Sequence, residues 1–121
     1  MERLWPISRE KEIEMIDPND AVNYILKHAP TYAKARAERI YLEEFRKSKK
    51  AILFRESPDK TIAEREHWAY AHPDYQSLLK GIRDAVEIEE KLRWDMIAAQ
   101  ARIEIWRSQE ATNRTVDKIL K

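Results

Sequence analysis

From residue 74 onward the chain holds no proline and a single glycine, Gly81. Proline and glycine are the residues that most often end a helix, so their near-absence predicts one helix over residues 74–120. An alternation of three and four residues supports this prediction, because that spacing places side chains on one face of a helix. Its ten positions, nine of them apolar, are Tyr75, Leu78, Ile82, Ala85, Glu89, Leu92, Met96, Ala99, Ile103 and Trp106.

Composition and length extend the prediction of helix to the whole chain. One glycine among 121 residues, with 43% apolar and 37% charged residues, favours an all-α fold built from long helices. An unbroken helix over 74–120 would extend about 70 Å, whereas a compact domain of this size has a radius of gyration near 14 Å. The sequence therefore predicts a helical hairpin with one very long, coiled-coil-like C-terminal helix that forms a homo-oligomer. A kink at Gly81 that makes a compact monomeric bundle is the alternative.

Prolines and capping residues divide the rest of the chain. Asp17 is typical of a helix start, Pro30 predicts an interruption, and Thr61 begins a Thr-x-x-Glu capping box. Residues 1–16 have no clean apolar period and are expected to form an N-terminal arm ahead of a single helical domain over 17–121. The expected helices cover about residues 18–28, 31–55, 62–71 and 74–120.

Charge is unevenly distributed although the formal net charge is only +1. Successive quarters of about thirty residues carry −2, +4, −4 and +3. The stretch 45–55 contains no acid and five basic residues: Arg46, Lys47, Lys49, Lys50 and Arg55. Helical spacing spreads Arg46, Lys49 and Lys50 along one side, where they can follow a phosphate backbone. The alternative is a solvated face that pairs with Glu43, Glu44 or the acids of a neighbouring helix.

An acidic group on the long helix is the counterpart of this basic stretch: Asp84, Glu87, Glu89 and Glu90. These acids have no second ligand set such as Glu-x-x-His on another helix, so we interpret them as a structural face and expect no metal site. His67 and His72 stand five residues apart, which is not the four-residue spacing of a helical zinc pair.

The segment 65–75 is rich in aromatic residues and contains two of the three histidines. Aromatic faces stack on unpaired bases, and a basic neighbour such as Arg65 favours that use. The alternative is that Trp68 and Tyr75 pack a helix corner while the histidines cap helix ends or face water. The sequence favours packing.

Catalytic and membrane signals are both weak. The chain has no cysteine, no serine in a nucleophile elbow and no glycine-rich phosphate loop, so we expect no enzyme and no cofactor. No apolar run exceeds the four residues of 51–54, far shorter than a membrane span. Absence of cysteine favours a reducing compartment, and we expect a cytoplasmic protein.

Two stretches carry a resemblance to a group of small helical proteins encoded by bacteriophages. They are residues 37–51, AERIYLEEFRKSKKA, and residues 92–110, LRWDMIAAQARIEIWRSQE. The layout of basic helix, aromatic corner and long C-terminal helix resembles the phage recombination-mediator proteins over about residues 21–114. That resemblance implies an oligomer that binds single-stranded DNA and helps to load a recombinase, in the cytoplasm of the infected host.

The resemblance also implies roles for particular residues. DNA contact is expected from Arg46, Lys47, Lys49, Lys50 and Arg55, as phosphate contacts that position the strand without reading its sequence. The oligomer interface is expected to use Leu92, Met96, Ile97, Ile103 and Trp106. A protein-interaction module, which uses the long helix and its acidic face to bind and inhibit or redirect a host protein, is the alternative function.

Overall fold

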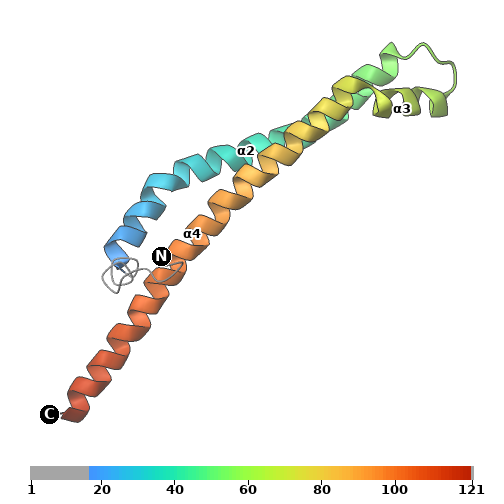
Figure 1. The fold of residues 1–121 in the computed structure, drawn as a ribbon. Helices are drawn as coiled ribbons and strands as arrows, with labels where there is room; N and C mark the ends of the chain where they lie inside the picture. Colours follow the sequence, from blue (N-terminus) through green and yellow to red (C-terminus); the bar gives the residue numbers. More distant parts are fainter. Residues whose placement is uncertain (1–16, 121) are drawn as a thin grey trace, which may run out of the picture. The chain divides into compact units, whose positions relative to one another are not determined.

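The computed structural model describes residues 17–120, and within this range the chain forms three helices and no strand. Helix α2 spans Pro18–Glu56, α3 spans Ile62–Ala71 and α4 spans Pro73–Leu120 (Figure 1). The predicted all-α fold, with helical hairpin packing and a very long C-terminal helix, is confirmed. The predicted N-terminal arm lies outside the described residues. None of the described helices is both long and apolar enough to cross a membrane.

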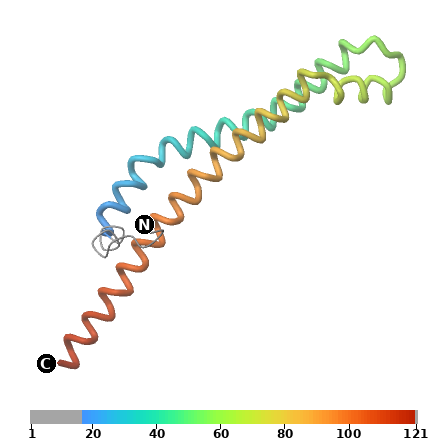
Figure 2. Tube along the Cα trace, viewed as in Figure 1, coloured from blue at the N-terminus to red at the C-terminus, as the bar shows by residue number. Residues whose placement is uncertain are grey.

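Helix α2 does not end near His28, as the sequence predicted, but continues through Pro30 to its last residue, Glu56. Its Cα trace is helical without a break from residue 18 to 56 (Figure 2). A proline inside a helix removes one backbone hydrogen bond and costs about 3 kcal/mol. The flanking residues contain no glycine and include several alanines and lysines, which favour helix on both sides. Thr31, the first residue of the helix predicted over 31–55, is therefore an interior residue of α2.

The connection between α2 and α3, residues 57–61, is held by side-chain contacts to its backbone. Ser57 is buried, and its Oγ accepts a hydrogen bond from the Asp59 amide at 3.2 Å. Arg65 Nε donates to the Asp59 carbonyl at 2.8 Å, so α3 is tied to the loop that precedes it. Arg65 is thus occupied in fixing the corner.

Side chains also define the ends of α3 and the start of α4. Thr61 Oγ1 accepts the Glu64 amide at 3.1 Å, which confirms the threonine half of the predicted capping box. After α3, His72 Nδ1 accepts the Asp74 amide at 3.0 Å. An imidazole nitrogen can accept this bond only when it carries no proton. His72 therefore serves as a cap at the start of α4.

Residues 31–92 form a compact group that we term the central unit. Within it α2 and α4 lie side by side and run in opposite directions (Figure 1). The contacts follow that order, because Arg39 of α2 meets Glu89 of α4 and Lys49 meets Asp74. The central unit is therefore an antiparallel helical hairpin.

The core of the central unit lies where α3 joins the hairpin. Leu53 of α2 is 1% exposed and packs with Ala69 of α3 and Tyr75 of α4. Trp68 and Leu79 pack against this cluster. The predicted packing role of Trp68 and Tyr75 is confirmed. Burial of one leucine side chain of this kind stabilises a fold by about 2 kcal/mol.

Residues 17–30 and 93–120 form a second group, the terminal unit. Its buried residues are small: Ala21 of α2 and Ala99 of α4 are each 1% exposed. Small side chains let helix backbones approach closely, but they bury little apolar area. A shallow hollow of about 180 Å³ in this unit is lined by Tyr24, Asp95, Ala98 and Arg102.

Helix α4 is helical through Gly81 without an interruption. Four positions of its three-four alternation are buried within the single chain: Tyr75, Ala85, Glu89 and Ala99. The stripe that the sequence predicted as an apolar seam is thus at least partly covered by the chain itself. The other apolar side chains of α4 are more open, and Ile88, Trp94 and Ile105 are exposed.

Candidate nucleic-acid interface

The last turns of α2 place three of the predicted DNA contacts around one hollow of the central unit. The hollow is open to solvent, has a volume of about 390 Å³, and is lined by Arg46, Lys47, Lys50, Tyr70 and Tyr75. Its cations come from α2, while Tyr70 lies on α3 and Tyr75 on α4. We call this group the basic hollow. It combines three positive charges with two aromatic rings.

Lys50 connects the basic and aromatic sides of the hollow. Its Nζ lies 4.7 Å from the centroid of the Tyr70 ring, over the ring face, and 3.7 Å from Glu66 Oε1. The hydrogen bond with Tyr70 is the largest cause that raises the pKa of Lys50, and the Glu66 carboxylate adds to it. Lys50 is therefore a firmly protonated cation that is shared between a ring and an acid.

Two other predicted contacts are paired with acids of the same unit. Lys47 Nζ lies 3.4 Å from Glu44 Oε2 in a pair exposed to solvent. Lys49 Nζ lies 3.7 Å from Asp74 Oδ2 and is not among the residues that line the hollow. The Lys47 pair is exposed on both sides, and surface ion pairs of that kind are weak. The basic face is thus partly neutralised by its own chain, as the alternative interpretation expected.

Arg46 and Arg55 differ from the lysines. Among residues 17–120 neither has a carboxylate within ion-pair distance, and both are exposed. Arg46 lines the basic hollow, whereas Arg55 stands in the last turn of α2 and does not. The structure therefore brings together Arg46, Lys47 and Lys50, and leaves Arg55 apart from them.

Tyr70 is the residue of this site that sequence reasoning missed. It is 41% exposed, and its ring meets the Tyr75 ring edge-on, with centroids 5.3 Å apart. The aromatic density of residues 65–75 signalled that a ring was available there, but not that it faces Lys50. That contact joins two residues twenty positions apart on different helices, so no local sequence pattern predicts it.

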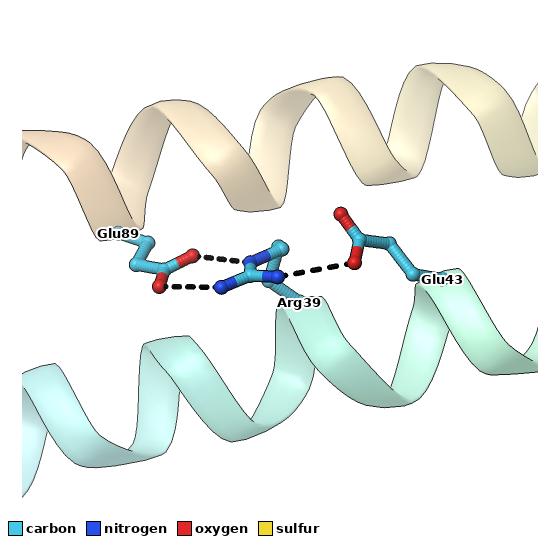
Figure 3. A network of polar contacts seen from close by, with 3 residues as sticks. All are labelled: Arg39, Glu43 and Glu89. Atoms are coloured by element: carbon cyan, nitrogen blue, oxygen red, sulfur yellow. Dashed lines mark hydrogen bonds and ion pairs between the residues drawn. The ribbon is translucent and has the colours of Figure 1, made fainter.

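A second charge network lies on the hairpin seam and is structural. Arg39 donates from Nε to Glu89 Oε2 at 2.6 Å and from a terminal nitrogen to Glu89 Oε1 at 3.0 Å. Its other terminal nitrogen donates to Glu43 at 3.0 Å, so the guanidinium lies between two helices (Figure 3). The hydrogen bonds to Glu89 and then Glu43 raise the pKa of Arg39 further above its ordinary value. Glu89, a member of the acidic group that we interpreted as a structural face and a position of the three-four alternation, is 6% exposed.

The residues expected at an oligomer interface differ in how exposed their side chains are. Leu92, in the central unit, and Met96, Ile97 and Ile103, in the terminal unit, are half-buried within the single chain. Trp106 is exposed, as are Trp94 and Ile105 on the same stretch of α4. Among the five residues expected at the interface, Trp106 is therefore the one most open to a second copy.

The basic hollow offers charge and aromatic surface, and its chemistry is that of binding. Guanidinium and ammonium groups donate to phosphate oxygens, and tyrosine rings offer flat faces to bases. Within residues 17–120, no three His, Cys, Asp or Glu side chains gather as metal ligands would. Comparisons with protein-family models, with curated proteins and with solved structures find no match to this chain.

Proposed function

We propose that this protein is a non-enzymatic, oligomeric accessory protein that binds single-stranded DNA and supports recombination or replication in a phage-infected cytoplasm. The observation that supports this function best is the basic hollow, where Arg46, Lys47 and Lys50 surround two tyrosines. Cations so grouped replace the counterions condensed on a phosphate chain, whatever its base sequence. The resemblance to phage recombination mediators supplies the biological setting.

Oligomerisation is part of the proposal for an energetic reason. Three cations in one hollow bind a strand weakly at physiological salt, because each phosphate contact contributes little there. Several copies in one assembly act on the same strand at high effective concentration, which raises the overall affinity without new contacts. The exposed apolar residues of α4, Trp94, Ile105 and Trp106, offer the surface for such an assembly.

The test is size exclusion with light scattering, with and without labelled oligo-dT, at several salt concentrations. We expect an oligomer that carries the strand at low salt and releases it at high salt. A plot of the logarithm of affinity against the logarithm of salt concentration should have a slope of about −0.7 for each phosphate contacted. Three cations in each protomer then give a slope of about −2 per protomer. An oligomer that ignores the strand at low salt would overturn the proposal.

A charge-matched pair of variants localises the contact. Arg46→Glu with Lys47→Glu should abolish strand binding and leave the mass of the assembly unchanged. The control is Lys80→Glu with Arg83→Glu, which makes the same change in net charge on exposed residues of α4 outside the hollow. Equal loss in both double variants would mean that overall charge, and not the basic hollow, holds the strand.

A second candidate function is supported by a different observation. Ile88 is 58% exposed and lies in a hollow of about 450 Å³ with Asp84, Glu87 and Lys91 on the outer side of α4. An apolar side chain flanked by acids suits a basic amphipathic segment of a host protein. If this is the function, Ile88→Asp should abolish a complex rebuilt from purified partners, and strand binding should be absent.

A further inference from the structure

We infer that Tyr70 is the residue that gives the basic hollow its preference for single strands, by stacking on one unpaired base, and that Lys50 covers the ring until a phosphate draws it away. This inference rests on the proposed function, because it concerns how the same hollow distinguishes strands. It assigns separate tasks to neighbouring side chains: cations hold phosphate, and one ring reads whether a base is free.

The mounting of Tyr70 suits a stacking surface. Tyr75, only 7% exposed, braces the ring edge-on from the core at 5.3 Å. The Gln76 side-chain amide donates to the Tyr70 carbonyl at 2.7 Å and holds the end of α3 in place. The Tyr70 ring is held by Tyr75 and is still 41% exposed, so it keeps its position before a ligand binds. Most of the ordering needed for stacking is therefore present before a strand arrives.

Lys50 occupies the ring face in the absence of a strand. Its ammonium lies over Tyr70 at 4.7 Å and reaches Glu66 at 3.7 Å. A phosphate held in the hollow by Arg46 and Lys47 competes with the partly exposed Glu66 carboxylate for that ammonium. When Lys50 turns to the phosphate, the Tyr70 face becomes available to the adjoining base. Phosphate binding and base stacking are thus coupled through one side chain.

This arrangement predicts that a single strand with free bases is distinguished from strands that offer phosphates alone. In a duplex the bases are already stacked on each other, so Tyr70 has no base to receive. An abasic single strand offers the same phosphates and no ring. Both should bind through the cations alone. Only a single strand with bases should use Tyr70 as well, and stacking on one aromatic residue adds about tenfold in affinity.

The experiment measures anisotropy titrations of the full chain with three labelled strands of equal length: oligo-dT, an abasic strand and a duplex. We expect Tyr70→Ala to weaken oligo-dT binding about tenfold and to leave binding of the abasic strand and the duplex unchanged. Tyr70→Phe should retain wild-type affinity for oligo-dT. The matched control is Tyr41→Ala, because Tyr41 is 61% exposed on α2 and does not line the hollow.

Failure of the inference can be told apart from failure of the proposed function. If the wild-type protein binds oligo-dT and the abasic strand equally, or Tyr70→Ala weakens both alike, the inference is wrong and the phosphate-binding function stands. If the wild-type protein binds none of the strands, the proposed function fails. Photocrosslinking of wild-type protein to an iodouracil strand gives a readout independent of folding in the variants: a crosslink at Tyr70 supports the inference, and crosslinks only elsewhere overturn it.

Discussion

At the scale of single residues, the contacts that matter most join side chains far apart in sequence. Arg39 and Glu89 are fifty residues apart, and their two hydrogen bonds align α2 with α4 at one register. This charge pair disfavours other registers, because a shifted hairpin would take the buried Glu89 carboxylate away from its guanidinium partner. Lys50 and Tyr70 form a second contact between distant residues, which joins α2 to α3 at the basic hollow.

Arg39 can be tested by substitution. Arg39→Met should lower the thermal midpoint clearly, because Glu89 loses two hydrogen-bond donors at a site that is 6% exposed. Glu43→Gln should change the midpoint much less, since that pair is more exposed and lies within one helix. Thermal unfolding followed by circular dichroism measures both. Equal effects of the two substitutions would contradict a special role for the bond between helices.

The raised pKa of Lys50 predicts that the stability of the protein depends on pH. Because the folded state raises the pKa of Lys50 above 10.5, the folded state favours the protonated amine. Its contribution to stability is therefore complete below about pH 10 and is lost as pH rises through the raised pKa. The difference in thermal midpoint between wild type and Lys50→Met should be constant from about pH 8 to 10 and shrink above that range. A difference that grows above that range would contradict the sign of this linkage.

At the scale of elements, local chemistry explains most helix bounds. Thr61 caps α3 and His72 caps α4, each through a hydrogen bond to an amide two or three residues later. Pro30 is the exception, because its effect depends on the helix around it. One missing hydrogen bond ends a short helix, but α2 has 39 residues and continues through it.

A substitution at Gly81 tests how much intrinsic helix propensity contributes to the stability of α4. A methyl group added at this residue would meet no atom within 4 Å, and the backbone is already helical. Gly81→Ala should therefore stabilise the protein by about 1 kcal/mol and raise the thermal midpoint by a few degrees, because alanine loses less backbone freedom on folding. A fall in the midpoint would show that the glycine serves a bend or a close contact in solution.

At the scale of the whole molecule, assembly is the property to measure. Trp106→Ala should lower the mass of the particle in light scattering, because Trp106 is an exposed apolar residue of α4. Ile62→Ala, at an exposed apolar residue that begins α3, should leave the mass unchanged. A wild-type protein that is monomeric at high concentration would rule out the homo-oligomer.

The amino-acid pattern alone was sufficient for the helical class, for α3 and α4 and for the basic stretch of α2. Helical hydrogen bonds, caps and apolar periodicity all depend on residues within about four positions of each other, so a linear pattern contains them. Packing decided what the pattern left open. It buried Glu89 against Arg39 and set Tyr70 beside Lys50. These outcomes depend on which turns of different helices meet, and that register arises from interactions across the fold.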